Sequence, residues 1–144
     1  MARLVDTNVL VYRFDARFPE KQAIATRLLR KGIEDEELRI AHQSIVEFVA
    51  ATTRPIGKGA RAGTLLTQHE AVREAEELMS QFPILYPNDD VVRTALRGMG
   101  AYQMSWFDAH LWAYAECFGL VELVSEDFAH GRVYGRVRVL NPFV

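Results

Sequence analysis

The chain has 144 residues, which is enough for one domain with a substantial core. Apolar residues make up 49% of it and charged residues 25%, a composition that is typical of soluble globular proteins and excludes a disordered chain. The formal net charge of −2 excludes an overall basic field, so a nucleic acid would have to be held by local basic patches or by bound metal.

Strand and helix patterns alternate through the first part of the chain. Short apolar stretches are separated by stretches of helical periodicity, and proline and glycine mark where helices begin and end. The predicted elements are, in order, a strand at 2–5, a short helix at 8–14, a helix from Pro19 to Gly32, a strand at 37–42 and a helix at 43–54 that Pro55 ends.

The alternation continues after PIGKGARAG, a glycine-rich basic loop without the Lys-Ser/Thr ending of a phosphate-binding Walker loop. The single cysteine, Cys117, falls in an apolar helical stretch and is expected to be a core residue in a reducing compartment. The pattern predicts one α/β domain over 1–144, with helices flanking a mainly parallel sheet. The further elements are helices at 64–82, 88–100 and 105–118 and strands at 84–86, 120–125 and 136–140.

Four acidic residues fall where such a sheet forms its sites, beyond the carboxyl ends of its strands. Asp6 follows the first strand in LVDTNVL, and Glu47 lies early in the helix after the second strand. Asp108 is near the start of the last predicted helix, and Asp127 follows the strand after it. Each has an ordinary alternative: an aspartate can cap a helix or stabilise its dipole, and a helical glutamate usually faces water.

The surroundings of two of these acids favour a functional role. Asp108 lies among large apolar residues, where a free carboxylate would need a partner such as a metal ion. Asp127 is predicted to point inward and Glu126 outward, because neighbours in an extended chain alternate and Phe128 begins the next apolar contact. Ser125 could bond to a carboxylate or a metal-bound water, although its spacing alone favours a turn-forming hydroxyl.

The other residues that carry chemistry are less informative. The four histidines form no pair at the helical spacing of metal ligands, and they are predicted to be structural or solvated. No Ser/His/Asp or Cys/His arrangement indicates nucleophilic catalysis.

If the four carboxylates converge, their repulsion would force some of them to take up protons unless a cation lay between them. Mg²⁺ or Mn²⁺ takes oxygen ligands, lowers the pKa of a bound water and offsets charge on a phosphodiester. Basic residues near the acids could hold a nucleic-acid backbone through its phosphates, or could form a solvated surface. They are Arg54, Lys58 and Arg61 after the helix of Glu47, and Arg132, Arg136 and Arg138 after Asp127.

The ordered motifs resemble a known family. DTN after the first strand, a helical glutamate at 47, SWFDAHLWAYA and VSEDFAHG are together similar to the PIN domain, and more narrowly to the single-domain VapC-type toxins of toxin–antitoxin pairs. The resemblance covers essentially the whole chain. It implies a three-layer α/β/α sandwich and a Mg²⁺- or Mn²⁺-dependent endoribonuclease. It also implies a catalytic, metal-binding quartet with two supporting polar residues: Asp6, Glu47, Asp108 and Asp127, supported by Asn8 and Ser125.

The resemblance implies partners as well. These are an RNA substrate, an antitoxin protein that masks the site, and commonly a second copy of the chain. A cytoplasmic protein without a membrane partner is expected, because no signal peptide opens the sequence and no apolar run reaches membrane-spanning length. His110 stands where the family often has an aliphatic residue, which is expected to affect packing and to leave the metal ligands intact.

Two other functions remain open from the sequence. One is a non-catalytic PIN-fold module that binds RNA or protein, with structural acids, although the presence of all four acids argues against it. The other is a phosphatase of the haloacid-dehalogenase type, which also begins with a strand and an aspartate. That chemistry needs a second aspartate two residues further on, where this chain has Asn8.

Overall fold

The computed structural model describes residues 1–57 and 63–144. In these ranges the strands form one sheet in the order β3-β2-β1-β4-β6-β5. All its pairings are parallel except that of β5 with β6. The strands are β1 (Arg3–Val5), β2 (Leu38–Ala41), β3 (Ile84–Leu85), β4 (Glu122–Val124), β5 (Val133–Tyr134) and β6 (Val137–Leu140).

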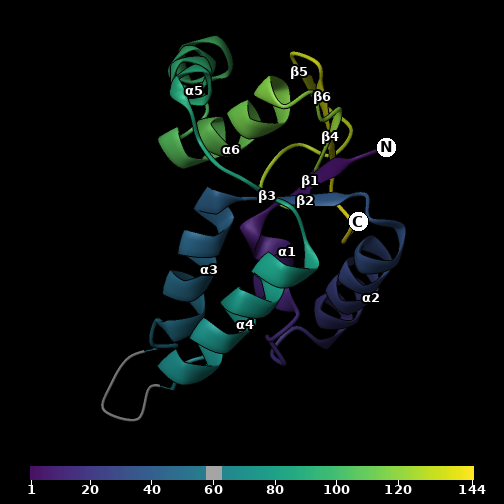
Figure 1. Cartoon of the computed structure of the whole chain (residues 1–144), viewed down its shortest axis with the longest axis vertical. Coiled ribbons are helices and arrows are strands. Elements are labelled where there is room, and N and C mark those ends of the chain that lie inside the picture. The colour runs from purple at the N-terminus through teal and green to yellow at the C-terminus, as the bar shows by residue number, and fades with distance from the viewer. Residues whose placement is uncertain (58–62) are drawn as a thin grey trace.

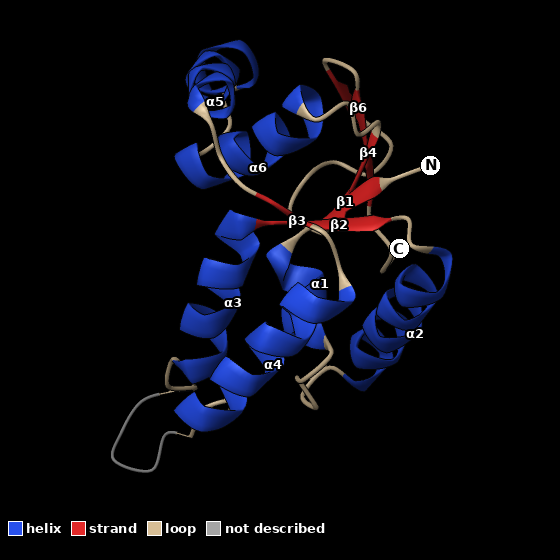
Figure 2. Ribbon diagram, viewed as in Figure 1, coloured by secondary structure: helices blue, strands red, loops and turns tan. Residues whose placement is uncertain are grey.

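Helices cover both faces of the sheet (Figure 1). One core cluster contains side chains of the first four helices, and the other contains side chains of the last two. This arrangement confirms the predicted three-layer α/β/α sandwich, and Figure 2 shows the strands between the two groups of helices. The helices are α1 (Thr7–Tyr12), α2 (Pro19–Asp35), α3 (His42–Thr53), α4 (Gln68–Gln81), α5 (Asp89–Tyr102) and α6 (Trp106–Cys117). No helix in the described ranges is long and apolar enough to cross a membrane.

The central strands are buried on both faces. Leu4 and Val5 are consecutive in β1 and fully buried, yet they belong to different clusters because neighbouring side chains of a strand point to opposite faces. Leu4 joins the cluster of α5 and α6, and Val5 joins that of the other helices. Burial on both sides explains why these strands read as continuous apolar runs in the sequence.

The order of the strands reverses between β1 and β4. From β1 the chain moves through β2 to β3 on one side, and it later returns to place β4 and β6 on the other side. Val5 is in register with Ile40 of β2 and with Val124 of β4, so the carboxyl ends of these three strands meet at one edge. Ligands of open α/β sheets bind at such a reversal point.

The helix predicted from residue 64 begins at Gln68 instead. The Thr67 hydroxyl accepts a hydrogen bond from the Glu70 amide at 3.1 Å, and the Glu70 carboxylate accepts one from the Thr67 amide at 3.0 Å. This reciprocal capping box ends the preceding loop and starts the helix. The sequence predicted an earlier start because Leu65 and Leu66, which precede the cap, are apolar and fit the helical spacing.

Two features near the end of the chain were not predicted. β5 forms a hairpin with β6 through a tight turn in which Gly135 has a φ of 60°, a conformation that glycine adopts readily. Cys117 is exposed at the last position of α6, so its assignment to the core was wrong. The helical stretch is apolar there, but its final turn extends beyond the buried layer.

Gly32 does not end α2, as the sequence suggested. The helix continues to Asp35, and Glu36 caps it in a left-handed conformation with a φ of 58°. Gly32 instead allows α2 to lie close to β2. A Cβ added at Gly32 would be 2.2 Å from Cδ1 of the fully buried Leu38.

Gly32→Ala is therefore expected to lower the free energy of unfolding by about 1–3 kcal/mol through overpacking. Urea denaturation would measure the change. The matched control is Gly100→Ala in α5, where an added Cβ meets nothing within 4 Å. Because alanine favours a helix over glycine, the control is expected to stabilise the protein by up to about 1 kcal/mol. Equal effects of the two substitutions would contradict this account of Gly32.

Candidate active site

Asp6 lies directly beyond β1, at the point where the strand order reverses. Its side chain is only 5% exposed, and it caps α1 by accepting a hydrogen bond from the Thr7 amide at 2.6 Å. The capping role considered from the sequence is therefore real. It uses one carboxylate oxygen and leaves the other for contacts across the sheet edge.

The second oxygen of Asp6 is held by a residue of the neighbouring strand. The hydroxyl of Ser125, which is fully buried after β4, donates to Asp6 Oδ2 at 2.5 Å and accepts from the Asp127 amide at 3.1 Å. The Asn8 amide group donates to Asp6 Oδ2 at 3.3 Å and to Ser125 Oγ at 3.4 Å. Ser125 thus both forms the turn and binds a carboxylate, the two roles that the sequence left open.

Glu47 approaches the same edge from α3. Its Oε1 accepts hydrogen bonds from the Thr7 hydroxyl at 3.0 Å and from Gln43 Nε2 at 3.3 Å. Gln43 Nε2 also donates to the backbone carbonyl of Phe107 at 3.0 Å, so it connects α3 with α6. Neither Thr7 nor Gln43 was predicted as a site residue, although Gln43 lies one helical turn before Glu47.

Asp108 lies in the first turn of α6, and its amide donates to the hydroxyl of the capping residue Ser105 at 3.2 Å. Its side chain is partly buried. Burial raises the pKa of the Asp108 carboxyl, and repulsion from the charge of Asp127 raises it further.

The pKa of Asp6 shows that the acids act on one another. Burial raises this pKa to about 7, and the charges of Asp127 and Glu47 push it in the same direction. The Ser125 hydroxyl and the Thr7 amide oppose the rise, but they do not cancel it. Asp127 and Glu47 therefore both act on the carboxyl of Asp6, and Asp127 also acts on that of Asp108.

Asp127 differs from its prediction in one respect. Its side chain is exposed to solvent, whereas Glu126, which was expected to point outward, is partly buried. Strand alternation does not apply here because β4 ends at Val124 and Ser125 holds the Asp127 amide in a turn. Asp127 stands at the rim of the site.

The sequence model of the PIN domain matches residues 3–136 of this chain. The chain belongs to the PIN domain family. A comparison with curated protein sequences found no significant match.

Solved PIN structures share the fold at low sequence identity. A toxin–antitoxin complex from Klebsiella pneumoniae matches with a TM-score of 0.69 and 20% identity, over 98% of this chain and 98% of the other. VapBC2 from Rickettsia felis, bound to a DNA fragment from its promoter, matches with a TM-score of 0.68 and 11% identity over 96% and 97%. Mycobacterium tuberculosis VapC20, a sarcin-ricin-loop-cleaving toxin, matches with a TM-score of 0.65 and 18% identity over 88% and 90%.

Carboxylate oxygens of the acids in this PIN domain are the donor type that Mg²⁺ and Mn²⁺ prefer. In the described part of the chain no three His, Cys, Asp or Glu side chains stand close enough to form a ready-made metal cage. Mg²⁺ sites are seldom such cages, because this ion keeps several waters and uses one or two carboxylates together with substrate phosphates. Asp6, whose pKa is raised by burial and further by the charges of Asp127 and Glu47, fits a site of that kind.

Two cavities adjoin Glu47. One, of about 450 Å³, is lined by Thr7, Glu47, Arg54 and Phe107, among others. The other, of about 280 Å³, is mainly apolar and also reaches Glu47 and Phe107. Its remaining walls include the rings of His42, Trp106, His110 and Tyr114.

Basic residues differ in how they relate to these cavities. Arg54 lines the larger one, while Lys58 and Arg61 lie outside the described residues. In the second basic group, Arg136 bonds to Glu116 at 3.2 Å, and the Arg132 guanidinium lies over the Tyr134 ring at 4.5 Å. Only Arg54, of the described members, is placed beside one of the acids by a shared cavity.

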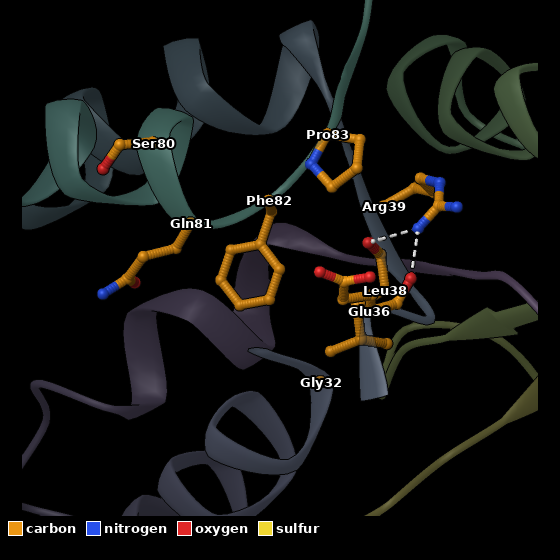
Figure 3. A pocket seen from close by; sticks show the side chains of 8 residues that line it. All are labelled: Gly32, Glu36, Leu38, Arg39, Ser80, Gln81, Phe82 and Pro83. Atoms are coloured by element: carbon orange, nitrogen blue, oxygen red, sulfur yellow. Dashed lines mark hydrogen bonds between the residues drawn. The ribbon is translucent and has the colours of Figure 1, made fainter. Parts of the chain in front are cut away.

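A further cavity of about 430 Å³ lies at the opposite, amino end of β2 (Figure 3). Its lining comes from α2, β2 and the end of α4, and Arg39 donates there to the carbonyls of Glu36 and Leu38. No acid of the quartet lines it. This cavity is therefore separate from the candidate site at the carboxyl edge of the sheet.

Asp6 is expected to make the metal-free protein less stable as the pH rises. Its pKa is about 7 in the folded state against an ordinary value of 3.8, so the folded chain binds this proton more tightly than the unfolded chain does. The stabilisation is full below about pH 4 and is lost as the pH rises through about 7. Urea unfolding in EDTA at about pH 5 and pH 8 would measure the loss.

Asp6→Asn has no carboxyl at this position and serves as the comparison. The loss of stability between the two pH values is expected to be smaller in this variant. An equal loss in the variant and the wild type would contradict a raised pKa at Asp6.

Proposed function

We propose that this protein is a divalent-metal-dependent endoribonuclease and the toxin of a type II toxin–antitoxin pair. The observation that carries the proposal is the buried Asp6 carboxylate, whose pKa is raised to about 7 partly by Asp127 and Glu47. A cation near these groups would favour their charged forms. Membership of the PIN family and structural likeness to VapC-type toxins support the same function.

In this proposal the ion is Mg²⁺ or Mn²⁺, and its ligands come from Asp6, Glu47, Asp108 and Asp127. When bound, such an ion supplies a water of lowered pKa and offsets negative charge on the phosphodiester. Ser125 and Asn8 both donate to Oδ2 of Asp6 and so hold its carboxylate in place. Asp6 would release its proton as the metal is loaded, because a neighbouring cation stabilises the carboxylate.

Thr7 and Gln43 would have the matching task for Glu47. Both donate to Oε1, so that this oxygen is oriented while Oε2 is left for the reaction centre. Gln43 also keeps α3 at a fixed distance from α6 through the Phe107 carbonyl. Gln43 therefore contributes to the relative placement of Glu47 and Asp108.

RNA is the substrate class that the surroundings of the acids support best. Unpaired RNA bases stack on aromatic and histidine rings, which line the 280 Å³ cavity beside Glu47. Arg54, at the 450 Å³ cavity, is placed to contact a phosphate. The structural neighbour described as a sarcin-ricin-loop-cleaving toxin is consistent with RNA cleavage by this fold.

Removing either of two acids should abolish cleavage. Asp6→Ala and Asp108→Asn are expected to reduce Mn²⁺-dependent cleavage of RNA by more than about 100-fold, because changes that only orient metal ligands already cost 10–100-fold. Gel analysis of a defined RNA at saturating Mn²⁺ would measure the rate. Asp90→Asn is the control, since Asp90 is an exposed first-turn acid of α5 as Asp108 is a first-turn acid of α6.

The control is expected to cleave as fast as the wild type. Equal background from the wild type and all variants would instead favour the non-catalytic binding module. Release of phosphate from a phosphate monoester would favour the phosphatase.

An antitoxin partner follows from the same proposal, because solved neighbours are toxin–antitoxin complexes. The proposal also includes a homodimer in the cytoplasm. Helix α5 offers a surface for it, with Val92, Leu96 and Met99 exposed at helical spacing.

Expression of the wild type is expected to arrest bacterial growth, while expression of Asp6→Ala is not. Co-expression of a small DNA-binding protein encoded beside the gene should restore growth, and that protein should co-purify with the wild type. Growth that is unaffected by expression of the wild type would contradict the toxin role.

A further inference from the structure

Glu126, the residue before Asp127, is held by side chains from two helices. The Tyr12 hydroxyl of α1 donates to Glu126 Oε1 at 2.7 Å. Lys21 of α2 donates to Glu126 Oε2 at 3.1 Å and to the Tyr12 oxygen at 3.3 Å. These three side chains, Tyr12, Lys21 and Glu126, form a closed set of contacts that we call the clamp.

Aromatic rings hold the ammonium of Lys21 in place. Its Nζ lies 4.9 Å from the centre of the Tyr12 ring, 5.6 Å from that of Phe143 and 5.8 Å from that of Phe18. The Tyr12 ring also packs edge-on against Phe18 and Phe143, at 5.7 and 5.1 Å. An exposed Lys–Glu pair contributes little on its own, but ring contacts and a shared tyrosine hydroxyl restrict this lysine to one geometry.

The clamp lies on one side of a short segment whose other side is already fixed. Ser125 bonds to Asp6 and to the Asp127 amide, so the segment is tied to β1. The clamp ties the next residue, Glu126, to α1 and α2. Asp127 itself is exposed, so its direction depends on the backbone of the two residues before it.

We propose that Tyr12, Lys21 and Glu126 are positioning residues that orient Asp127 toward a bound divalent cation. This inference rests on the proposed function. Groups that orient metal ligands affect affinity although they never touch the ion. The clamp acts in this way through one peptide unit, and it makes Lys21 and Tyr12 part of the site although neither is an acid.

Loss of the clamp is expected to weaken Mn²⁺ binding by about tenfold, which is the lower end of the range for groups that orient ligands. The variants are Lys21→Met, which keeps the length and apolar stem of the side chain, and Tyr12→Phe, which removes only the hydroxyl. Isothermal titration with Mn²⁺ alone, well below the unfolding temperature, measures the Kd. Cleavage of RNA by both variants should approach the wild-type rate when Mn²⁺ is saturating.

Matched controls separate this effect from general destabilisation. Lys31→Met changes another lysine of α2, which makes an exposed ion pair with Asp35. Tyr102→Phe removes the hydroxyl of a tyrosine whose ring packs against Trp112 and Tyr134. Both controls are expected to bind Mn²⁺ as the wild type does.

The possible failures are distinguishable. If Lys21→Met and Tyr12→Phe lower the unfolding temperature but leave the Mn²⁺ Kd unchanged, the clamp stabilises the fold without orienting Asp127. That result overturns the inference. The same holds if cleavage stays low at saturating Mn²⁺, because misplacement of a ligand is relieved by excess metal. If the wild type itself neither binds Mn²⁺ nor cleaves RNA, the proposed function fails and the inference fails with it.

Discussion

Asp6 is buried at the carboxyl end of β1, where water cannot solvate its charge, and the groups around it have to compensate for that burial. A carboxylate in this position is costly unless it is hydrogen-bonded or paired with a cation. The Ser125 hydroxyl, the Thr7 amide and the Asn8 amide group each donate a hydrogen bond to it. They do not supply a positive charge, so the carboxyl keeps a raised pKa.

The same constraint organises the residues further out. Thr7 is the first residue of the helix that Asp6 caps, and its hydroxyl donates to Glu47. Ser125, which donates to Asp6, also accepts a hydrogen bond from the Asp127 amide and so fixes the backbone at Asp127. Two hydroxyl side chains thus connect one buried acid with two others, and each connection spans a different pair of secondary structure elements.

Much of this architecture was predictable from the sequence, for identifiable reasons. The strands around β1 are buried on both faces, so they appear as apolar runs, and proline, serine and asparagine mark helix starts. The placement of Asp6 after β1, of Glu47 early in the helix after β2 and of Asp127 after β4 followed from the rule that parallel strands end at one edge. The three-layer arrangement and the family came from the order of motifs along the chain.

Features that depend on contacts between distant segments were not predictable. Gly32 looks like a helix stop, and only its contact with Leu38 reveals a packing role. Gln43 becomes part of the site through the Phe107 carbonyl, which is 64 residues away. Asp127 and Glu126 exchange their expected exposures because hydrogen bonds to Ser125 and Tyr12, rather than strand alternation, decide their directions.

The strand order also has a consequence for synthesis of the protein on the ribosome. Asp6 is made before Ser125, which lies 119 residues later in the chain. Until β4 has been made, β1 has an open edge on that side and its aspartate has no hydroxyl partner from the neighbouring strand. A nascent or truncated chain that stops before β4 therefore carries the first acid without the site. The order of the strands therefore delays assembly of this edge until β4 has been made.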